Sequence, residues 1–254
     1  FLKSVDQTKP GGMETCCDVA LLDGQIEVAV LRGMKVEHPK YKDKHVFGAG
    51  INLTHLYHGR IPFLWYLERD LGYVNKLYRG LALPDDAPPD EFGGQTIEKP
   101  WIAAVESFAI GGHCQILLAV DYVLAENSAF LTLPARKEGI IPGAANMRLP
   151  RFVGDRIARQ AIQYERRLEC DSPEGRLICD AIVETGGMDA AIERVTAGLT
   201  SSGVVSAASN RRAFRITQEP LEMFREYFAI YAREQAYCHF SPALIANLEK
   251  YWNA

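Results

Sequence analysis

Two short glycine-bearing segments have the residue types and spacing needed to stabilise a negatively charged oxygen. The first is FGAGI at residues 47–51, and the second is IGGH at residues 110–113. Glycine lets the backbone approach a ligand closely, and a glycine turn that opens a helix leaves N–H donors unpaired. Two such donors aimed at one point form an oxyanion hole, which stabilises a thioester enolate or a tetrahedral adduct. Each segment taken alone is also compatible with an ordinary tight turn in an α/β sheet.

The segments that must position these turns are short apolar runs typical of strands. Residues 26–31 (IEVAVL) and 101–105 (WIAAV) predict strands that are buried on both faces of a sheet. Further strands are expected at residues 121–125 and 129–133.

Helical periodicity surrounds these strands. Helices are expected at residues 13–22 and over residues 53–81, the latter interrupted near Gly59 and Pro62. Residues 83–94, rich in proline and aspartate, predict a loop. From residue 155 onward the pattern predicts only helices, at 156–164 with Asp155 as the cap, from Ser172-Pro173, and at 190–199, 206–217, 220–238 and 242–252. The chain is therefore predicted to have an α/β core over residues 1–154 and a helical region over residues 155–254.

Composition excludes several classes of protein. The 254 residues are 48% apolar with a net charge of −4, which excludes a disordered chain and argues against a nucleic-acid partner. No apolar run reaches the roughly 18 residues of a membrane span. The six cysteines show no CxxC spacing and predict free thiols in a reducing cytoplasm. His55 and His58 could share a helix face, but no third ligand accompanies them, so no metal is expected.

The order of four segments resembles the crotonase, or enoyl-CoA hydratase/isomerase, superfamily. They are FGAGI (47–51), ESFAIGGHCQ (106–115), DYVLA (121–125) and FLTLPARKEGIIPGAANMRLPRFVG (130–154). The resemblance runs from Met13 to Val183 and implies a spiral of ββα units with a helical C-terminal region that trimerises. It also implies that the backbone N–H groups of Ile51 and Gly112 form the oxyanion hole. Crotonases begin with strands before the helix at 13–22, and we expect these strands, and a further helical domain, to be missing here.

The same resemblance implies a site for a CoA thioester. Its contacts would come from Ala49, Gly50, Ile51, Asn52 and Leu53. In the preceding loop, cationic side chains suit phosphate oxygens, namely those of His38, Lys40, Lys42 and Lys44. These side chains are equally compatible with a solvated loop.

Two departures from the family pattern bear on the reaction. Hydratases of this family have two catalytic glutamates, and those positions correspond to Gln115 and Ala135. An amide does not titrate and a methyl group has no proton to give, so hydration is not expected. Ala135 and Ile140, with Ile51, would instead line an apolar cavity able to hold a gas molecule.

The resemblance is strongest to the cofactor-independent dioxygenases of glycopeptide-antibiotic pathways. It implies that 3,5-dihydroxyphenylacetyl-CoA and O2 are converted to 3,5-dihydroxyphenylglyoxylate and CoA, without metal or flavin. Gln115 and Arg69 are the candidates for contacting substrate oxygens, Arg69 being equally compatible with a surface salt bridge. Glu138 is a candidate for the proton-abstracting base, although it is also compatible with a solvated loop.

Alternatives from other classes remain open. The chain could be a thioesterase or isomerase of the same superfamily, or a non-catalytic protein that binds CoA. Aromatic residues of the C-terminal helices, among them Tyr227 and Phe228, fit a buried core or an oligomer interface. We expect a cytoplasmic homo-oligomer, a trimer or hexamer, with an acyl-CoA and O2 as its small-molecule partners and no nucleic acid or membrane.

Overall fold

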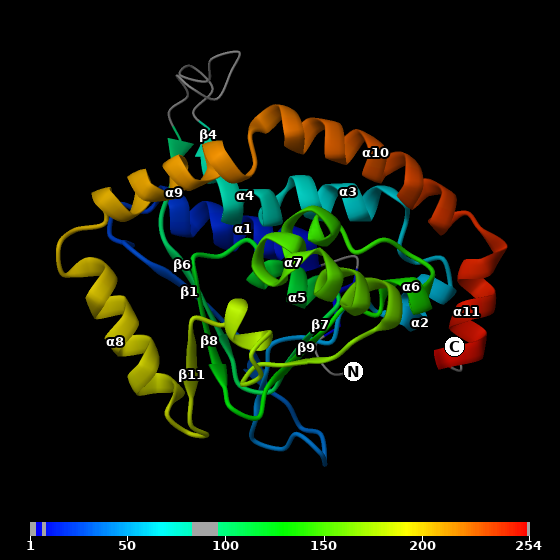
Figure 1. Cartoon of the computed structure of the whole chain (residues 1–254), viewed down its shortest axis with the longest axis horizontal. Coiled ribbons are helices and arrows are strands. Elements are labelled where there is room, and N and C mark those ends of the chain that lie inside the picture. Colours follow the sequence, from blue (N-terminus) through cyan, green and yellow to red (C-terminus); the bar gives the residue numbers. More distant parts are fainter. Residues whose placement is uncertain (1–3, 7–8, 83–95, 253–254) are drawn as a thin grey trace.

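A four-stranded parallel sheet forms the centre of the molecule (Figure 1). The computed structural model describes residues 4–6, 9–82 and 96–252, so the loop predicted at residues 83–94 lies outside them. Strand order is β1-β6-β8-β11. The strands are β1 (Ala29–Arg32), β6 (Trp101–Val105), β8 (Tyr122–Glu126) and β11 (Ala181–Val183). Parallel neighbours need long crossover connections, which place other elements over the sheet faces.

The two strands predicted to be buried on both faces differ in their position in this sheet. Every residue of β6 is buried, because Trp101, Ala103 and Val105 pack in one apolar cluster and Ile102 and Ala104 pack in another, on the opposite face of the sheet. Residues 26–31 were predicted to form a strand buried on both faces, and this was wrong. The strand β1 begins at Ala29, lies at the edge of the sheet and is largely half-buried. An apolar run of this length does not distinguish an edge strand from a central one.

A second sheet of three short strands runs beside the first and completes the repeating unit. It has the order β10-β9-β7, with β7 (Phe108–Ile110), β9 (Phe130–Thr132) and β10 (Leu168–Glu169). Strands β6 and β7 lead into α5 (Gly112–Leu117), and β8 and β9 lead into α6 (Ala135–Glu138). In each unit the first strand joins the large sheet and the second joins the small one. This arrangement confirms the predicted α/β fold of ββα units.

The N-terminal half supplies helices in both predicted regions, although the first begins at Lys9, four residues before the predicted start at residue 13. They are α1 (Lys9–Leu22), α2 (Leu53–Tyr57), α3 (Leu64–Leu71) and α4 (Tyr73–Arg79). The predicted interruption near Gly59 and Pro62 separates α2 from α3, and Gly72 causes a second break that was not predicted. Two small antiparallel strand pairs were also not predicted: β2 (Met34–Lys35) with β3 (His45–Val46), and β4 (Leu81–Ala82) with β5 (Thr96–Ile97).

The region beyond residue 154 is not helical throughout, which corrects the prediction. Both β10 and β11 lie there, and β11 closes the main sheet. Ser172-Pro173 leads only into a 3-10 turn, Gly175–Leu177. Helix α7 (Ala145–Tyr164) begins ten residues before the Asp155 cap that was expected, and the non-helical backbone of Gly154 (φ 75°) divides it. The division into two domains at residue 154 stays a prediction.

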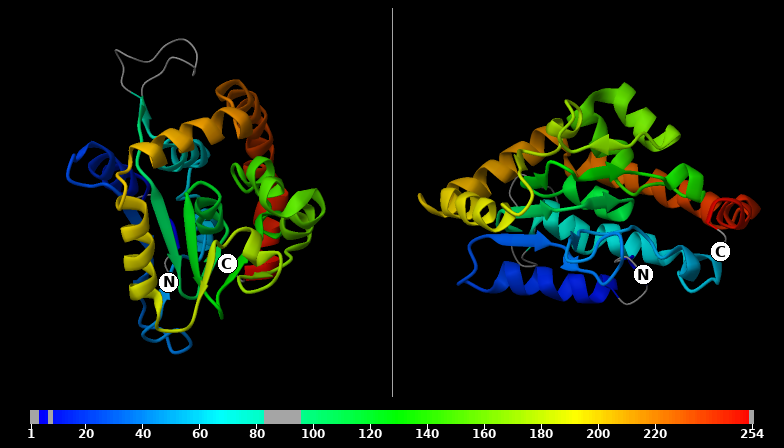
Figure 2. Two further views of the ribbon diagram at one scale, coloured as in Figure 1. Left: turned by 60° about the vertical axis from the view of Figure 1, so that its left-hand side comes forward. Right: turned by 90° about the horizontal axis from the view of Figure 1, so that it is seen from below.

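The last four helices wrap the outside of the molecule, as Figures 1 and 2 show. They are α8 (Met188–Thr200), α9 (Val205–Gln218), α10 (Leu221–His239) and α11 (Pro242–Trp252), close to the predicted positions. One apolar cluster joins α2 and α3 to α10 and α11 through Leu56, Trp65, Phe228 and Leu248. The C-terminal helices therefore pack against the segment that follows the first glycine turn.

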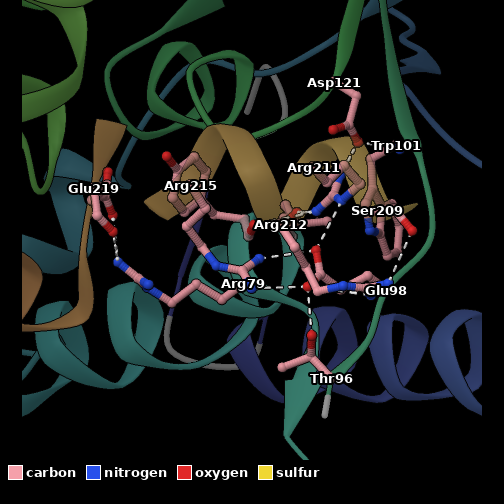
Figure 3. A network of polar contacts seen from close by, with 12 residues as sticks. Arg79, Thr96, Glu98, Trp101, Asp121, Ser209, Arg211, Arg212, Arg215 and Glu219 are labelled. Atoms are coloured by element: carbon pink, nitrogen blue, oxygen red, sulfur yellow. Dashed lines mark hydrogen bonds and ion pairs between the residues drawn. The ribbon is translucent and has the colours of Figure 1, made fainter. Parts of the chain in front are cut away.

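Buried ion pairs fix α9 and the start of α10 (Figure 3). The Glu219 carboxylate is fully buried and accepts two hydrogen bonds from Arg148, of 2.8 and 2.9 Å. Burial alone would raise the pKa of Glu219, but Arg148, Arg79 and Arg151 hold this pKa below its ordinary value. Breaking such a pair leaves a buried charge unpaired, at a cost of about 3–5 kcal/mol. A matching pair joins Glu98 to Arg215 at 2.9 Å.

No helix in residues 4–6, 9–82 and 96–252 has both the length and the apolar character needed to cross a bilayer.

Candidate active site

The two glycine segments lie side by side in the structure. The Ile110 N–H donates to the Gly48 carbonyl at 2.9 Å, and the Gly48 N–H lies 3.4 Å from the Phe108 carbonyl. Gly48 and Ala109 form an isolated parallel bridge. The segment before α2 therefore runs along β7 as an additional short strand.

Glycine is required where the two segments cross. Gly50 has φ 81° and Gly111 has φ 55°, in the left-handed region that L side chains rarely adopt. A Cβ on Gly111 would lie 3.5 Å from the Gly50 Cα, and a Cβ on Gly50 would lie 3.3 Å from the Ile110 carbonyl oxygen. This close approach brings Ile51 beside Gly112, although the two are 112 − 51 = 61 positions apart in the sequence.

Both of the predicted donor groups are free of internal partners. Val5 pairs with the edge of the first segment that faces away from β7. The Val5 N–H donates to the Gly50 carbonyl at 2.7 Å, and the Val5 carbonyl accepts from the Asn52 N–H at 2.8 Å. The Ile51 N–H between them points away from Val5, as alternate groups of an extended chain do. Gly112 is the first residue of α5, where N–H groups have no partner within the helix. Neither N–H makes a hydrogen bond to any residue that the structure describes.

His113 holds the backbone just before the first donor, the Ile51 N–H. Its Nδ1 accepts a hydrogen bond from the Gly50 N–H at 3.2 Å. Its ring fills the space where a Cβ on Gly48 would lie. Burial of the ring, together with the nearby charges of Arg69 and Lys9, lowers the pKa of His113 to about 3. The imidazole is therefore neutral and able to accept at neutral pH, a role that the sequence analysis did not predict.

Replacing His113 with phenylalanine is expected to lower both kcat and stability. The Gly50 N–H would lose its acceptor, which costs about 1–3 kcal/mol for a buried donor. Because the pKa of His113 is lower when folded, wild-type stability should fall as pH decreases below about 6.5, and H113F should lack this contribution. Thermal unfolding and turnover between pH 4 and pH 8 measure both effects. H113Q, whose amide oxygen can accept, is the control, and equal kcat for H113F and wild type would contradict the role.

Arg69 lies directly behind the second donor. The alternative of a salt bridge with a neighbour such as Glu68 or Asp70 is confirmed for Asp70, but the pair is buried and not on the surface. One guanidinium nitrogen, Nη2, donates to the Gly112 carbonyl at 2.5 Å, and the other, Nη1, donates to Gln115 Oε1 at 2.8 Å and to Asp70 Oδ1 at 2.5 Å. Arg69 therefore holds the first turn of α5 in place.

Gln115 is oriented by this contact. Because its Oε1 accepts from Arg69, its amide NH2 is the end left to donate toward the site. Asp70 is buried beside it, and burial raises the pKa of Asp70 although Arg69 and Arg148 oppose the shift. Arg69 and Asp70 thus form a buried pair whose charges offset each other.

A small pocket of about 30 Å³ lies in front of these groups. This volume is enough for one water-sized molecule. Its apolar walls come from Ile51, Ala135, Ile140 and Ile141, and its polar walls include Gly112, Gln115, Arg69, Asp70 and Glu138. The structure therefore brings every residue predicted as catalytic or as part of the oxygen pocket around one cavity. The roles of these residues stay predictions.

Of the residues predicted to bind CoA, only Ile51 lines this pocket. His38 and Lys42 are exposed on the loop before β3, and Lys44 is half-buried there. Asn52 caps α2, since its side chain accepts from the His55 N–H at 3.1 Å. Further residues of the first segment lie beside the pocket without lining it, namely Ala49, Gly50 and Leu53.

Several residues that line the pocket were not predicted, among them Val5, Tyr66 and Tyr231. Tyr66 lies three residues before Arg69 on α3, and this helical spacing was a signal that could have found it. Tyr231 comes from α10, and no local pattern connects it to the site. Glu138, expected as a candidate base or a solvated charge, is buried on α6.

Within the described chain, no group of three or more histidine, cysteine, aspartate or glutamate side chains is placed to hold a metal ion. All six cysteines are free thiols.

Comparison with known proteins points to one family. Residues 94–219 match the family model described as enoyl-CoA hydratase/isomerase. The chain is 46% identical over 236 residues to a (3,5-dihydroxyphenyl)acetyl-CoA 1,2-dioxygenase of Amycolatopsis orientalis, an alignment that covers 92% of this chain and 52% of that protein. It is 28% identical over 149 residues to a carnitinyl-CoA dehydratase of Citrobacter koseri, covering 56% of this chain and 57% of that protein. The chain thus spans about half the length of the curated relatives it matches.

Solved structures share the fold. An enoyl-CoA hydratase/isomerase from Xanthobacter autotrophicus Py2 superposes with a TM-score of 0.76 at 22% identity, covering 97% of this chain and 84% of that one. An enoyl-CoA hydratase from Mycobacterium avium subsp. paratuberculosis K-10 gives a TM-score of 0.74 at 21% identity, covering 98% and 87%. At this level of identity the likeness concerns the fold alone.

Proposed function

The chain belongs to the enoyl-CoA hydratase/isomerase family, and from this premise we propose that it is a cofactor-independent dioxygenase of an arylacetyl-CoA thioester. The substrate would be 3,5-dihydroxyphenylacetyl-CoA, as the name of the Amycolatopsis orientalis relative indicates. The products would be 3,5-dihydroxyphenylglyoxylate and free CoA. A cytoplasmic place in glycopeptide-antibiotic biosynthesis is part of the same proposal.

One observation carries this proposal. Two unpaired backbone N–H groups, at Ile51 and Gly112, adjoin a pocket whose lining is mostly apolar and includes the side chains of Ile51, Ala135 and Ile140. The N–H groups suit an enolate oxygen, and the apolar walls suit a small apolar molecule better than an ordered water.

The first step is formation of the enolate. The thioester and the aryl ring acidify the α-proton, and its removal places negative charge on the thioester oxygen. That oxygen would accept hydrogen bonds from Ile51 and Gly112. Arg69 contributes by holding the Gly112 peptide in position through its carbonyl.

The second step is reaction with O2 in the apolar part of the pocket. The enolate gives one electron to O2, and recombination of the two radicals forms a peroxide on the α-carbon. The peroxide attacks the thioester carbonyl and expels CoA as a thiolate. The remaining α-proton is then lost to solvent, the electron pair of its C–H bond forms the keto group, and the O–O bond breaks with its electron pair on the oxygen that becomes part of the carboxylate. The amide NH2 of Gln115 would donate to the peroxide oxygen.

Binding requires movement of the pocket walls. A volume of about 30 Å³ holds O2 or one water but not an aryl ring, so side chains lining the pocket must move apart when the thioester binds. Lys40, Lys42 and Lys44 lie on the loop that leads into β3, and we propose that they contact the phosphates of CoA.

An oxygen electrode tests the function. Chelator-treated protein mixed with 3,5-dihydroxyphenylacetyl-CoA should consume one O2 for each CoA released. Under nitrogen, CoA release should stop. CoA release that continues under nitrogen would indicate a thioesterase, and neither O2 uptake nor CoA release would indicate a non-catalytic protein.

We also propose that the chain forms a homo-oligomer, a trimer or a hexamer, through its C-terminal helices. Large apolar side chains are exposed along them, with 62% of Phe214, 69% of Tyr237 and 73% of Phe240 accessible. Exposed aromatic residues of this kind are enriched at protein interfaces.

Replacing Phe240 with glutamate is expected to shift the oligomer toward the monomer, because a charge at an apolar interface loses its hydration when the interface forms. Light scattering coupled to size exclusion measures the mass. Tyr164→Glu, an equally exposed aromatic position on α7, is the control. A monomeric wild type would contradict the proposal.

A further inference from the structure

Glu138 is a buried carboxylate on the wall of the site pocket, and the mechanism above gives it no role. Only 5% of Glu138 is exposed. It is the last residue of the one-turn helix α6, three positions after Ala135, so the two side chains share a helix face. Both line the pocket together with Ile51 and Gly112. The Glu138 carboxylate makes no hydrogen bond or ion pair with any residue in the described part of the chain.

The groups around Glu138 come from several elements. The ionisable ones are Tyr66, Arg69 and Asp70 on α3 and Tyr231 on α10, which line the same pocket, and Glu165 at the end of α7, whose charge acts on Glu138. The cation nearest the pocket, Arg69, is already bonded to Asp70 and to Gln115. Lys137, the neighbour of Glu138, lies 3.7 Å from Glu165 instead. Burial, followed by the like charge of Glu165, raises the pKa of Glu138 to about 7.

Among the described residues, two carboxylates line the pocket, and they are not equivalent. Asp70 is bonded to the Arg69 guanidinium, so it is held as the partner of a buried cation. Glu138 has no such partner and faces the same small cavity as the two oxyanion donors. Because the cavity holds about one small molecule, the groups that line it are close enough to act on the same bound substrate.

We propose that Glu138 is the base that removes the α-proton of the thioester, an inference that rests on the proposed function. The C–H bond breaks, its electron pair enters the enolate held by Ile51 and Gly112, and the proton forms an O–H bond on Glu138. When CoA later leaves as a thiolate, it takes this proton and Glu138 becomes a carboxylate again. On the same face of α6, Glu138 thus accepts the proton and Ala135 forms part of the wall next to O2.

Proton exchange without oxygen tests this role separately from the oxygen chemistry. Under nitrogen in D2O, wild-type protein should exchange the α-protons of 3,5-dihydroxyphenylacetyl-CoA, as followed by NMR. Glu138→Gln should slow this exchange by about 100-fold or more, the usual effect of removing a general base. Glu165→Gln is the matched control: it removes a neighbouring carboxylate outside the pocket and should keep the exchange.

The pH profile and a folding check support the assignment. Wild-type exchange should rise with pH and level off above about pH 7, where Glu138 is ionised. E165Q should move this rise in exchange rate to lower pH, since it removes the negative charge that helps to raise the pKa of Glu138. E138Q should not show the rise. Glu138→Asp should recover part of the rate. E138Q should bind phenylacetyl-CoA with a Kd within about threefold of wild type, and its Tm at pH 8 should be no lower, because it removes a carboxylate that folding buries.

The outcomes separate the two proposals. Undiminished exchange in E138Q, in a wild type that consumes O2, would overturn the role of Glu138 and leave the dioxygenase proposal standing. Exchange in the wild type that is lost in E138Q, but without any O2 uptake, would support Glu138 and overturn the dioxygenase. No exchange in the wild type would overturn the role of Glu138.

Discussion

Replacing Gly112 with proline is expected to reduce O2 uptake and CoA release by about 10²–10³-fold, the usual loss when one oxyanion donor is removed. Proline has no N–H, and Gly112 is the first residue of α5, a position where proline is tolerated. The helix should therefore persist while the donor disappears. Steady-state rates in the oxygen electrode measure the effect.

Gly112→Ala separates the lost donor from the added side chain. A Cβ at this position would lie 3.1 Å from Arg69 Nη2, so either substitution displaces the guanidinium slightly. Alanine keeps the N–H, and its rate should stay well above that of G112P. Equal rates for G112A and G112P would show that crowding against Arg69, and not the N–H, accounts for the loss.

Replacing Ala135 with glutamate is expected to abolish most O2 uptake, by roughly 100-fold, which corresponds to about 2.7 kcal/mol of transition-state stabilisation. The new side chain would fill a pocket of about 30 Å³ and bring water with its charge. It would also lie one helical turn from Glu138, and two like charges at this spacing raise the pKa values of both groups. Alanine 135 is at the start of α6, where an acidic residue is favourable to the helix.

Ala135→Gly is the control for this substitution, since it adds no polar group and leaves the pocket slightly larger. It should keep most of the O2 uptake. Anaerobic exchange of the α-protons distinguishes the two effects of A135E. If the new side chain only fills the oxygen pocket, O2 uptake falls and proton exchange does not. If it also raises the pKa of Glu138, proton exchange at neutral pH falls as well. Full dioxygenase activity in A135E would contradict the idea of an apolar oxygen pocket.

The sequence predicted the site more completely than it predicted the elements around it. Gly50 and Gly111 have backbone conformations and contacts that require glycine, so a local motif carried three-dimensional information. The order of motifs placed Ile51, Gly112, Gln115 and Ala135 in one site, and the structure brings them around one pocket.

Short elements were predicted poorly for a physical reason. Strands β10 and β11 have two and three residues, too few to show a period of two. The first half of α7 contains Pro150 and follows a Pro-Gly turn, so its pattern was typical of a loop. In both cases tertiary pairing or packing stabilises a conformation that the local sequence does not favour.

Burial of charged side chains was the other information that the sequence lacked. Arg69 and Glu138 belong to local patterns that fit solvent-exposed positions equally well. Their burial depends on elements that are distant in the chain: α10 packs over α3, and α11 packs over α6. The same packing raises the pKa of Glu138 and encloses the Arg69–Asp70 pair.

Isotope labelling with 18O2 tests the central claim most directly, namely that a sheltered enolate reacts with molecular oxygen and that the resulting peroxide cleaves its own thioester. A single turnover of 3,5-dihydroxyphenylacetyl-CoA, rapidly quenched, should give an arylglyoxylate with one 18O in the keto group and one in the carboxylate. The label should be absent when 18O-labelled water replaces labelled O2. Release of unlabelled arylacetate, or an oxygen derived from water in the carboxylate, would contradict the account.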